Sequence, residues 1–103
     1  MTNVQLTSTP APDNSHINIV LGGDITLANS SEITQNLIQI LGEYDSIELG
    51  TSNITNIDIS GIQIFYALRK LAETQHKKLR MKLNIPESNT ELFTTAGIEI
   101  NNL

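Results

Sequence analysis

The chain has 103 residues, a length that suits one domain spanning residues 1–103. Hydrophobic residues make up 39% and charged residues 17% of the sequence, which is typical of a globular protein and excludes a disordered one. The net charge of -5 argues against nucleic acid as a partner. There is no cysteine, which excludes disulfides, thiolate metal sites and a cysteine nucleophile.

The sequence predicts neither membrane insertion nor a bound cofactor. No apolar run approaches the roughly 20 residues of a membrane-spanning helix, and the N-terminus lacks the basic and apolar regions of a signal peptide. We therefore expect a cytoplasmic protein with no direct membrane insertion. His16 and His76 are isolated and predict no metal site, and Gly22-Gly23 is too short for a phosphate-binding loop.

The first part of the chain predicts a β-hairpin. Residues 2–6 form a short strand, and the proline- and asparagine-rich segment 7–15 forms a turn. Apolar residues alternate with others over 16–21, which predicts a second strand. The Gly22-Gly23-Asp24 segment is expected to end that strand, because glycine gives the backbone conformational freedom.

The middle of the chain predicts a helix, a strand and a buried connection. Apolar residues recur at helical spacing over 27–41, with a capping-box-like start at Asn29 and Glu32 and a glycine stop at Gly42. Residues 45–51 form a strand. Residues 53–59 are expected to be a connection that contributes buried isoleucines.

The last part predicts a helix, a strand and a second, shorter helix. An apolar stripe over 61–75 gives the clearest amphipathic helix of the sequence. Strict alternation over 79–85 predicts a strand with one wet face. Pro86 opens a short helix that would bury Leu92, Phe93 and Ala96, and a strand over 98–100 would be the fifth.

The predicted order is β-β-α-β-α-β-α. Strands that alternate with helices pair in parallel through right-handed crossovers, and the opening hairpin makes the sheet mixed. Because one face of the strand over 79–85 is polar, we expect the helices to cover only one face of the sheet. The fold class is therefore α/β, with a mixed sheet of four to five strands.

The charges are unevenly distributed along the chain. Before residue 69 the sequence carries only acidic charges, and all the basic residues follow: Arg69, Lys70, Lys77, Lys78, Arg80 and Lys82. Two interpretations remain open. The basic residues either increase solubility and stabilise the C-terminal end of a helix, or they belong to a bipolar surface that docks a protein partner.

Residues 56–62 join the β-rich half to the best helix, with Ser60 at the junction. Ser60 lies three residues before Gln63, the spacing of a capping box, so its hydroxyl is expected to cap the helix. Asp58 is a second candidate to accept hydrogen bonds from the helix start. A hydroxyl at a helix N-terminus is also well placed to carry a phosphate, because free N–H groups and the helix dipole favour an anion there.

In this element order, three motifs resemble the STAS domain, which occurs in bacterial anti-sigma factor antagonists and in sulphate transporters. They are Gly22-Gly23-Asp24 before the first helix, residues 58–62 (Asp-Ile-Ser-Gly-Ile) at the start of the second, and residues 91–98 near the end. The resemblance covers nearly the whole chain. The middle motif, Asp-x-Ser/Thr-Gly-Leu/Ile at a strand-to-helix turn, is the most specific of the three.

The resemblance implies a switch protein that is not an enzyme. In such antagonists the serine of this motif is phosphorylated by a partner that is both an anti-sigma factor and a GHKL-type serine kinase, and a PP2C-type phosphatase removes the phosphate. The unphosphorylated form binds the anti-sigma factor and frees a sigma factor. Here Ser60 is the acceptor. The residues expected to contact a partner around it are Asp24, Asp58, Ile59, Gly61, Ile62 and Tyr66.

Two features depart from the family pattern. The residue before the acceptor is often serine or threonine in these antagonists and is Ile59 here, and many members have a further helix after the segment at which this sequence ends. STAS domains also serve as the small subunit of a bacterial lipid-transport ABC complex without any kinase, which is the alternative function. A serine hydrolase is not expected, because the sequence around Ser60 is no nucleophile elbow.

Overall fold

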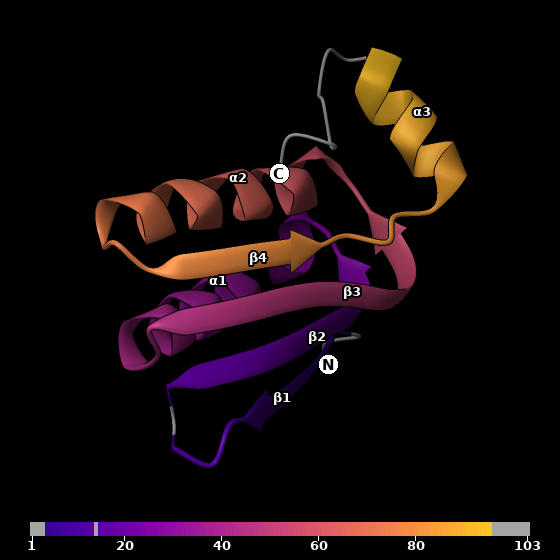
Figure 1. Cartoon of the computed structure of the whole chain (residues 1–103). Coiled ribbons are helices and arrows are strands. Elements are labelled where there is room, and N and C mark those ends of the chain that lie inside the picture. Colours follow the sequence, from indigo (N-terminus) through magenta and orange to yellow (C-terminus); the bar gives the residue numbers. More distant parts are fainter. Residues whose placement is uncertain (1–3, 14, 96–103) are drawn as a thin grey trace.

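The computed structural model describes residues 4–13 and 15–95. Along this part of the chain the elements alternate as the sequence predicts (Figure 1). They are β1 (Val4–Pro10), β2 (His16–Ile25), α1 (Leu27–Glu43), β3 (Ser46–Ile57), α2 (Ile59–Thr74), β4 (Lys78–Lys82) and α3 (Glu87–Thr95).

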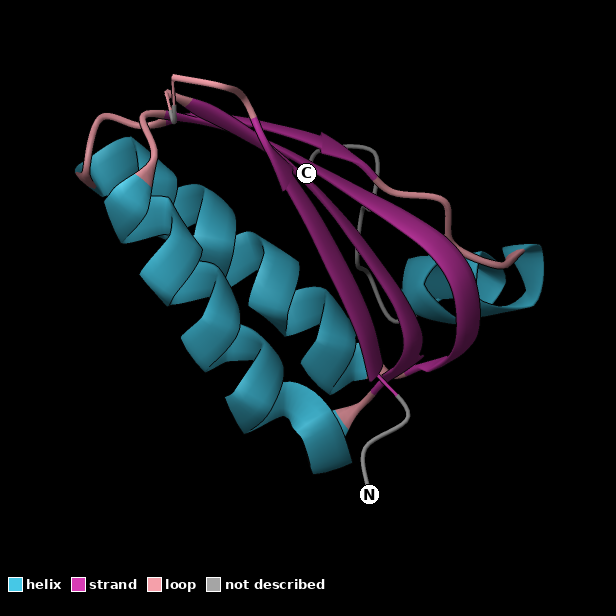
Figure 2. Ribbon diagram, turned by 90° about the horizontal axis from the view of Figure 1, so that it is seen from below, coloured by secondary structure: helices cyan, strands magenta, loops and turns pink. Residues whose placement is uncertain are grey.

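The four strands form one mixed sheet in the order β1-β2-β3-β4. β1 pairs antiparallel with β2, whereas β2 with β3 and β3 with β4 are parallel pairs. Helices α1 and α2 lie side by side on one face of this sheet (Figure 2). The predicted fold class is confirmed: a mixed sheet with helices on one face, in the order β-β-α-β-α-β-α.

The core lies between the sheet and the two long helices. The sheet contributes alternate residues such as Ile19, Leu21 and Leu49, each at most 2% exposed. Leu37 of α1 and Phe65 of α2 fill the space above them and are equally buried. Each such side chain stabilises the fold by roughly 1.5–3 kcal/mol, so this layer holds the helices to the sheet.

Three strands are longer than predicted and one is shorter: β1 continues to Pro10 instead of ending at residue 6, and β4 ends at Lys82 instead of residue 85. β2 does not end at Gly22 but continues to Ile25, and β3 absorbs the segment that was expected to be a connection. The pairing between them shifts register around Gly23, which has a φ of 83°. A Cβ on Gly22 would lie 2.2 Å from the carbonyl oxygen of Ser52. The glycines therefore allow an irregular, close approach of two strands, and the prediction of a turn there was wrong.

The end of the chain is only partly described. α3 lies apart from α1 and α2, at the curved end of β3, and the Asn89 side-chain amide donates to the carbonyl of Ile57 at 3.2 Å. Phe93 is fully buried, as predicted. Ala96 and the strand predicted over 98–100 lie outside the described residues. Within the described ranges no helix is long and apolar enough to cross a membrane.

Candidate functional site

The candidate site forms where two parallel strands end next to each other. Ile25 at the end of β2 pairs with Ile57 at the end of β3, and the N–H of Asp58 donates to the carbonyl of Ile25 at 3.4 Å. A helix begins directly after each strand, so the N-termini of α1 and α2 meet at this edge of the sheet (Figure 2). In open α/β sheets this is the usual place for a functional site.

Asp58 links the two helix N-termini. It is the N-cap of α2, with extended backbone, and its Oδ1 accepts a hydrogen bond from the N–H of Gly61 at 3.0 Å. Its Oδ2 accepts from the N–H of Leu27, the first residue of α1, at 3.1 Å. One carboxylate thus satisfies orphan donors of both helices. A negative charge is favourable at this place, because the positive end of the helix dipole lies at the N-terminus.

The prediction that Ser60 caps α2 was therefore wrong. Asp58 precedes the helix in extended conformation, so Ser60 is the second residue inside it. The capping-box spacing to Gln63 was a misleading signal, because an aspartate two residues earlier fits the N-cap equally well in the sequence. The hydroxyl of Ser60 is consequently not engaged in holding the helix end, and its side chain is partly exposed.

Asp24 lies at the same edge and is held by its own network. Its Oδ2 accepts hydrogen bonds from the hydroxyl of Thr26 at 2.9 Å and from the amide of Asn29 at 3.0 Å. The Asn29 amide also donates to the backbone carbonyl of Asp24 at 2.9 Å. Asn29 is 7% exposed and lies inside α1, so it does not start that helix as predicted; Thr26 is the N-cap and makes no side-chain capping bond.

This network was missed from the sequence. The spacing of Asn29 to Glu32 predicted a capping box, and no prediction was made for Thr26. The spacing Asp24-x-Thr26 is a weak signal for a local side-chain hydrogen bond, which short polar residues form readily. The bond to Asn29 depends on how β2 joins α1 and has no local sequence signature.

Gly61 is required by close packing. A Cβ at this position would lie 2.2 Å from the carbonyl oxygen of Ile25 and 3.0 Å from side-chain carbons of Ile25 and Ile57. The first turn of α2 therefore rests directly on the ends of β2 and β3. This contact fixes the position of Ser60 relative to the edge of the sheet, because Ser60 directly precedes Gly61 and is separated from Asp58 by only one residue.

The other residues predicted to bind a partner divide into exposed and buried ones. Ile59 is 46% exposed and Tyr66 is 39% exposed, and they lie seven residues apart, on one side of α2. Ile62 is fully buried in the core, and Gly61 is buried as well. Gly61 and Ile62 therefore affect a partner contact only indirectly, because they determine the shape of the start of α2.

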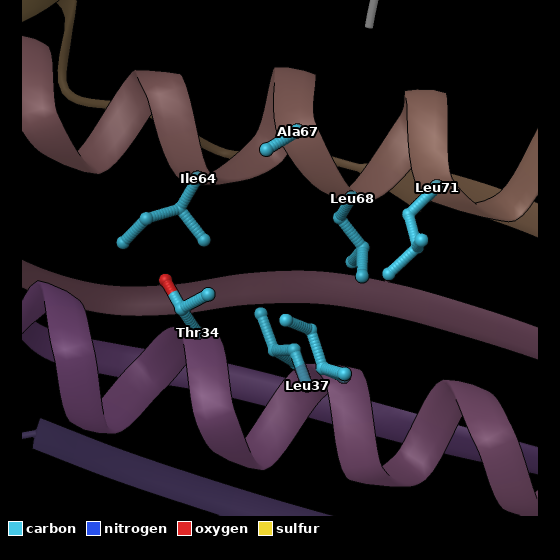
Figure 3. Close-up of a pocket in the computed structure, with 7 residues that line it drawn as sticks. Thr34, Leu37, Ile64, Ala67, Leu68 and Leu71 are labelled. Atoms are coloured by element: carbon cyan, nitrogen blue, oxygen red, sulfur yellow. The ribbon is translucent and has the colours of Figure 1, made fainter.

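An apolar groove lies between the two helices. It has a volume of about 250 Å³ and is lined by Thr34, Leu37 and Ile38 of α1 and by Ile64, Ala67, Leu68 and Leu71 of α2 (Figure 3). Ile64, Ala67 and Leu71 follow Ser60 at four, seven and eleven residues, the spacing of one helix face. The groove and the hydroxyl thus share one stripe of α2.

Chemically, this edge offers a hydroxyl at a helix N-terminus, at the same edge as the carboxylates of Asp24 and Asp58. The first turn of α2 presents backbone N–H groups and the positive end of a 16-residue helix dipole to Ser60. Over the described part of the chain, no group of three or more His, Asp or Glu side chains is arranged to hold a metal ion.

Comparison with protein families places the chain in the STAS class. Residues 9–100 match the family model described as "Mlab, STAS domain". Because the match covers most of the sequence, this protein belongs to that STAS family. No curated protein matches the sequence.

Solved structures of anti-sigma factor antagonists share the fold. The chain is similar to the Bacillus cell fate determinant SpoIIAA in its phosphorylated form, with a TM-score of 0.63 and 16% identity over 92% of this chain and 84% of SpoIIAA. It is also similar to an antisigma-factor antagonist STAS domain from Rhodobacter sphaeroides, with a TM-score of 0.64 and 15% identity over 77% of this chain and 85% of that one. The resemblance to antagonists that the sequence predicted is confirmed at the level of the fold.

Proposed function

We propose that the protein is a cytoplasmic, phosphorylatable partner-switching regulator. Its unphosphorylated form binds an anti-sigma factor that is also a GHKL-type serine kinase, phosphorylation of Ser60 releases that partner, and a PP2C-type phosphatase reverses the step. This role requires no catalysis and no cofactor from the chain itself. SpoIIAA, which shares the fold, is known in a phosphorylated form, and that supports the proposal.

The observation that carries the proposal is the position of Ser60. It is partly exposed in the first turn of α2, and Asp58 has taken over the capping role. Modification of its hydroxyl therefore breaks no hydrogen bond that holds the helix end. The fold is expected to survive phosphorylation, because a phosphate at this place also faces the positive end of the helix dipole.

Charge explains why a phosphate would release a partner. A phosphoserine adds about -1.5 to -2 charges beside Asp58, where a carboxylate already lies. Exposed Ile59 and Tyr66 flank this point, and the apolar groove begins one turn further along. A partner that covers these apolar side chains would have to bury the new charge, which is costly without a matching cation.

Mass spectrometry and a pull-down test this function together. The tagged protein, purified from its host with phosphatase inhibitors, should carry one phosphate that maps to Ser60. Ser60→Ala should retain the co-purifying kinase, and Ser60→Asp should lose it. The matched control is Ser31, an exposed serine near the start of α1, where the same two substitutions should change nothing. Phosphate on the Ser60→Ala protein would contradict the assignment.

The second candidate is a constitutive STAS subunit of a bacterial lipid-transport ABC complex. The apolar groove between α1 and α2 favours it, because permanent interfaces are more hydrophobic than transient ones. In this case the pull-down should recover an ABC ATPase instead of a kinase, from phosphate-free protein, and the groove substitution Ala67→Glu should abolish recovery.

A further inference from the structure

The face of the sheet opposite α1 and α2 presents a second surface (Figure 2). Burial alternates along the first part of β2: Ile17 and Ile19 face the helices, whereas Asn18 and Val20 between them are exposed. The strand pairing aligns the exposed positions in rows across the sheet. His16, Ser46 and Lys78 form one row, Asn18, Glu48 and Arg80 the next, and Val20, Gly50 and Lys82 the third.

This open face is basic although the protein is acidic. Lys78, Arg80 and Lys82 are exposed at alternate positions of β4, so their side chains form a line with a repeat of about 7 Å. Within the three rows named above, Glu48 carries the one carboxylate. Because the whole chain has a net charge of -5, the excess of acidic residues lies elsewhere, and this face differs from the rest of the protein in the sign of its charge.

The carboxylate of Glu48 is neutralised within the face. The ammonium group of Lys82 lies 2.8 Å from its Oε1, and this hydrogen bond holds the pKa of Glu48 below its ordinary value. The salt bridges within the described ranges engage Lys82 and Lys77; Lys78 and Arg80 form none, and Arg80 acts on Glu48 only through a weaker charge–charge interaction. Two cations therefore remain for an external anion.

A shallow polar groove of about 490 Å³ lies beside these cations, and its residues include His16, Ser46, Lys78 and Arg80. The floor is ordered by hydrogen bonds: Nδ1 of His16 lies 2.8 Å from the Ser46 hydroxyl, and Nε2 lies 3.0 Å from the Asn18 side-chain oxygen. Next to the groove, Val20 is 45% exposed and pairs in register with Gly50, which has no side chain. The Val20 side chain is therefore an exposed apolar group in the same row as Lys82.

We propose that this basic face binds an extended acidic segment of a partner protein, independently of the Ser60 site. The alternate side chains of an extended peptide repeat at about the 7 Å spacing of Lys78 and Arg80, so two successive carboxylates can each meet a cation. The exposed side chain of Val20 offers an apolar contact to the same segment. A nucleic acid fits less well, because its dense charge would meet the overall negative charge of the protein.

The test uses an NMR titration of the ¹⁵N-labelled full chain with a synthetic octapeptide of alternating Glu and Val. At low salt the peptide should shift the amides of β4 and of His16 and Asn18 and leave those around Ser60 unchanged. The affinity should fall steeply as salt is added, because the binding is between exposed charges. A peptide with Lys in place of Glu should not bind. Absence of binding, or shifts confined to other surfaces, overturns the proposal.

A matched pair of charge reversals tests the location. Arg80→Glu and Lys70→Glu change the net charge equally, but Lys70 lies on α2, away from this face. Arg80→Glu should weaken peptide binding by about tenfold or more, and Lys70→Glu by less than about threefold. Equal losses would mean that only overall charge matters and would refute a defined site.

Two further measurements separate this inference from its competitors. Ser60→Asp should leave the peptide affinity unchanged, so the outcome does not depend on whether Ser60 is ever phosphorylated. A lower affinity for that variant would place the peptide at the Ser60 edge and overturn the proposal. Vesicles with anionic lipid and a single-stranded oligonucleotide serve as alternative anions at the same salt. Tighter binding to either one than to the peptide would identify a different class of partner.

Discussion

Gly61→Ala should destabilise the protein strongly, against the ordinary preference of helices. Alanine is about 1 kcal/mol better than glycine inside a helix, so propensity alone predicts a gain. The structure predicts the opposite, because the new Cβ would lie 2.2 Å from the Ile25 carbonyl oxygen, far inside the 3.4 Å at which ordinary contact begins. The obstacle is backbone, which cannot rotate away as the end of a flexible side chain can.

The expected loss of stability in Gly61→Ala depends on how far the surrounding backbone must move. Overpacking of a tight contact costs typically about 1–3 kcal/mol, and a backbone obstacle places this site at the upper end. With the propensity gain subtracted, we expect a net loss of about 2 kcal/mol in the free energy of unfolding. For a domain of this size that corresponds to a melting temperature lower by roughly 8–16 °C.

Gly42→Ala is the matched control. Gly42 lies in the last turn of α1, and a Cβ there would meet nothing within 4 Å. The same substitution should therefore stabilise the protein by about 0.5–1 kcal/mol. Urea unfolding followed by circular dichroism measures both variants. If Gly61→Ala is as stable as the parent protein, α2 does not rest on the strand ends as described.

Three other predictions follow from single contacts. Asp58→Ala should cost about 1–2 kcal/mol in urea unfolding, because the cap of α2 is lost, whereas Ser60→Ala should change stability by less than about 0.5 kcal/mol; the reverse ranking would restore Ser60 as the cap. Phe65→Ala should cost about 3–5 kcal/mol, since its side chain is fully buried between helices and sheet, and a loss below about 1 kcal/mol in the same assay would contradict that packing. Lys82→Met should raise the pKa of Glu48 in an NMR titration, because the Lys82 hydrogen bond is the main cause that lowers it. A depressed carboxyl pKa contributes stability that is present above the ordinary pKa of glutamate and is lost as the pH falls through the folded value, so the effect of Lys82→Met on stability should disappear in acid. An unchanged pKa of Glu48 in that variant would show that the pair does not persist in solution.

Local sequence patterns determined most of the elements of this fold. Alternation of apolar residues predicted β2 and β4, and helical spacing predicted α1 and α2, because burial of one face imposes a period on the sequence. The order of the elements then indicated the parallel pairing, since parallel neighbours need a crossover connection and a helix usually supplies it. The motif at residues 58–62 was also recognisable, because its residue types lie next to each other in the chain.

Contacts between residues that are far apart in the sequence were decided only by the tertiary structure. The bond from Asp58 to the N–H of Leu27 spans 31 positions and depends on the register of β2 and β3, which no local pattern encodes. The glycine at position 22 was interpreted as a point of backbone freedom that ends a strand, yet it faces a backbone carbonyl of another segment. The same reason explains the error about the cap: two neighbouring polar residues fit the role locally, and the contact with α1 gave it to Asp58.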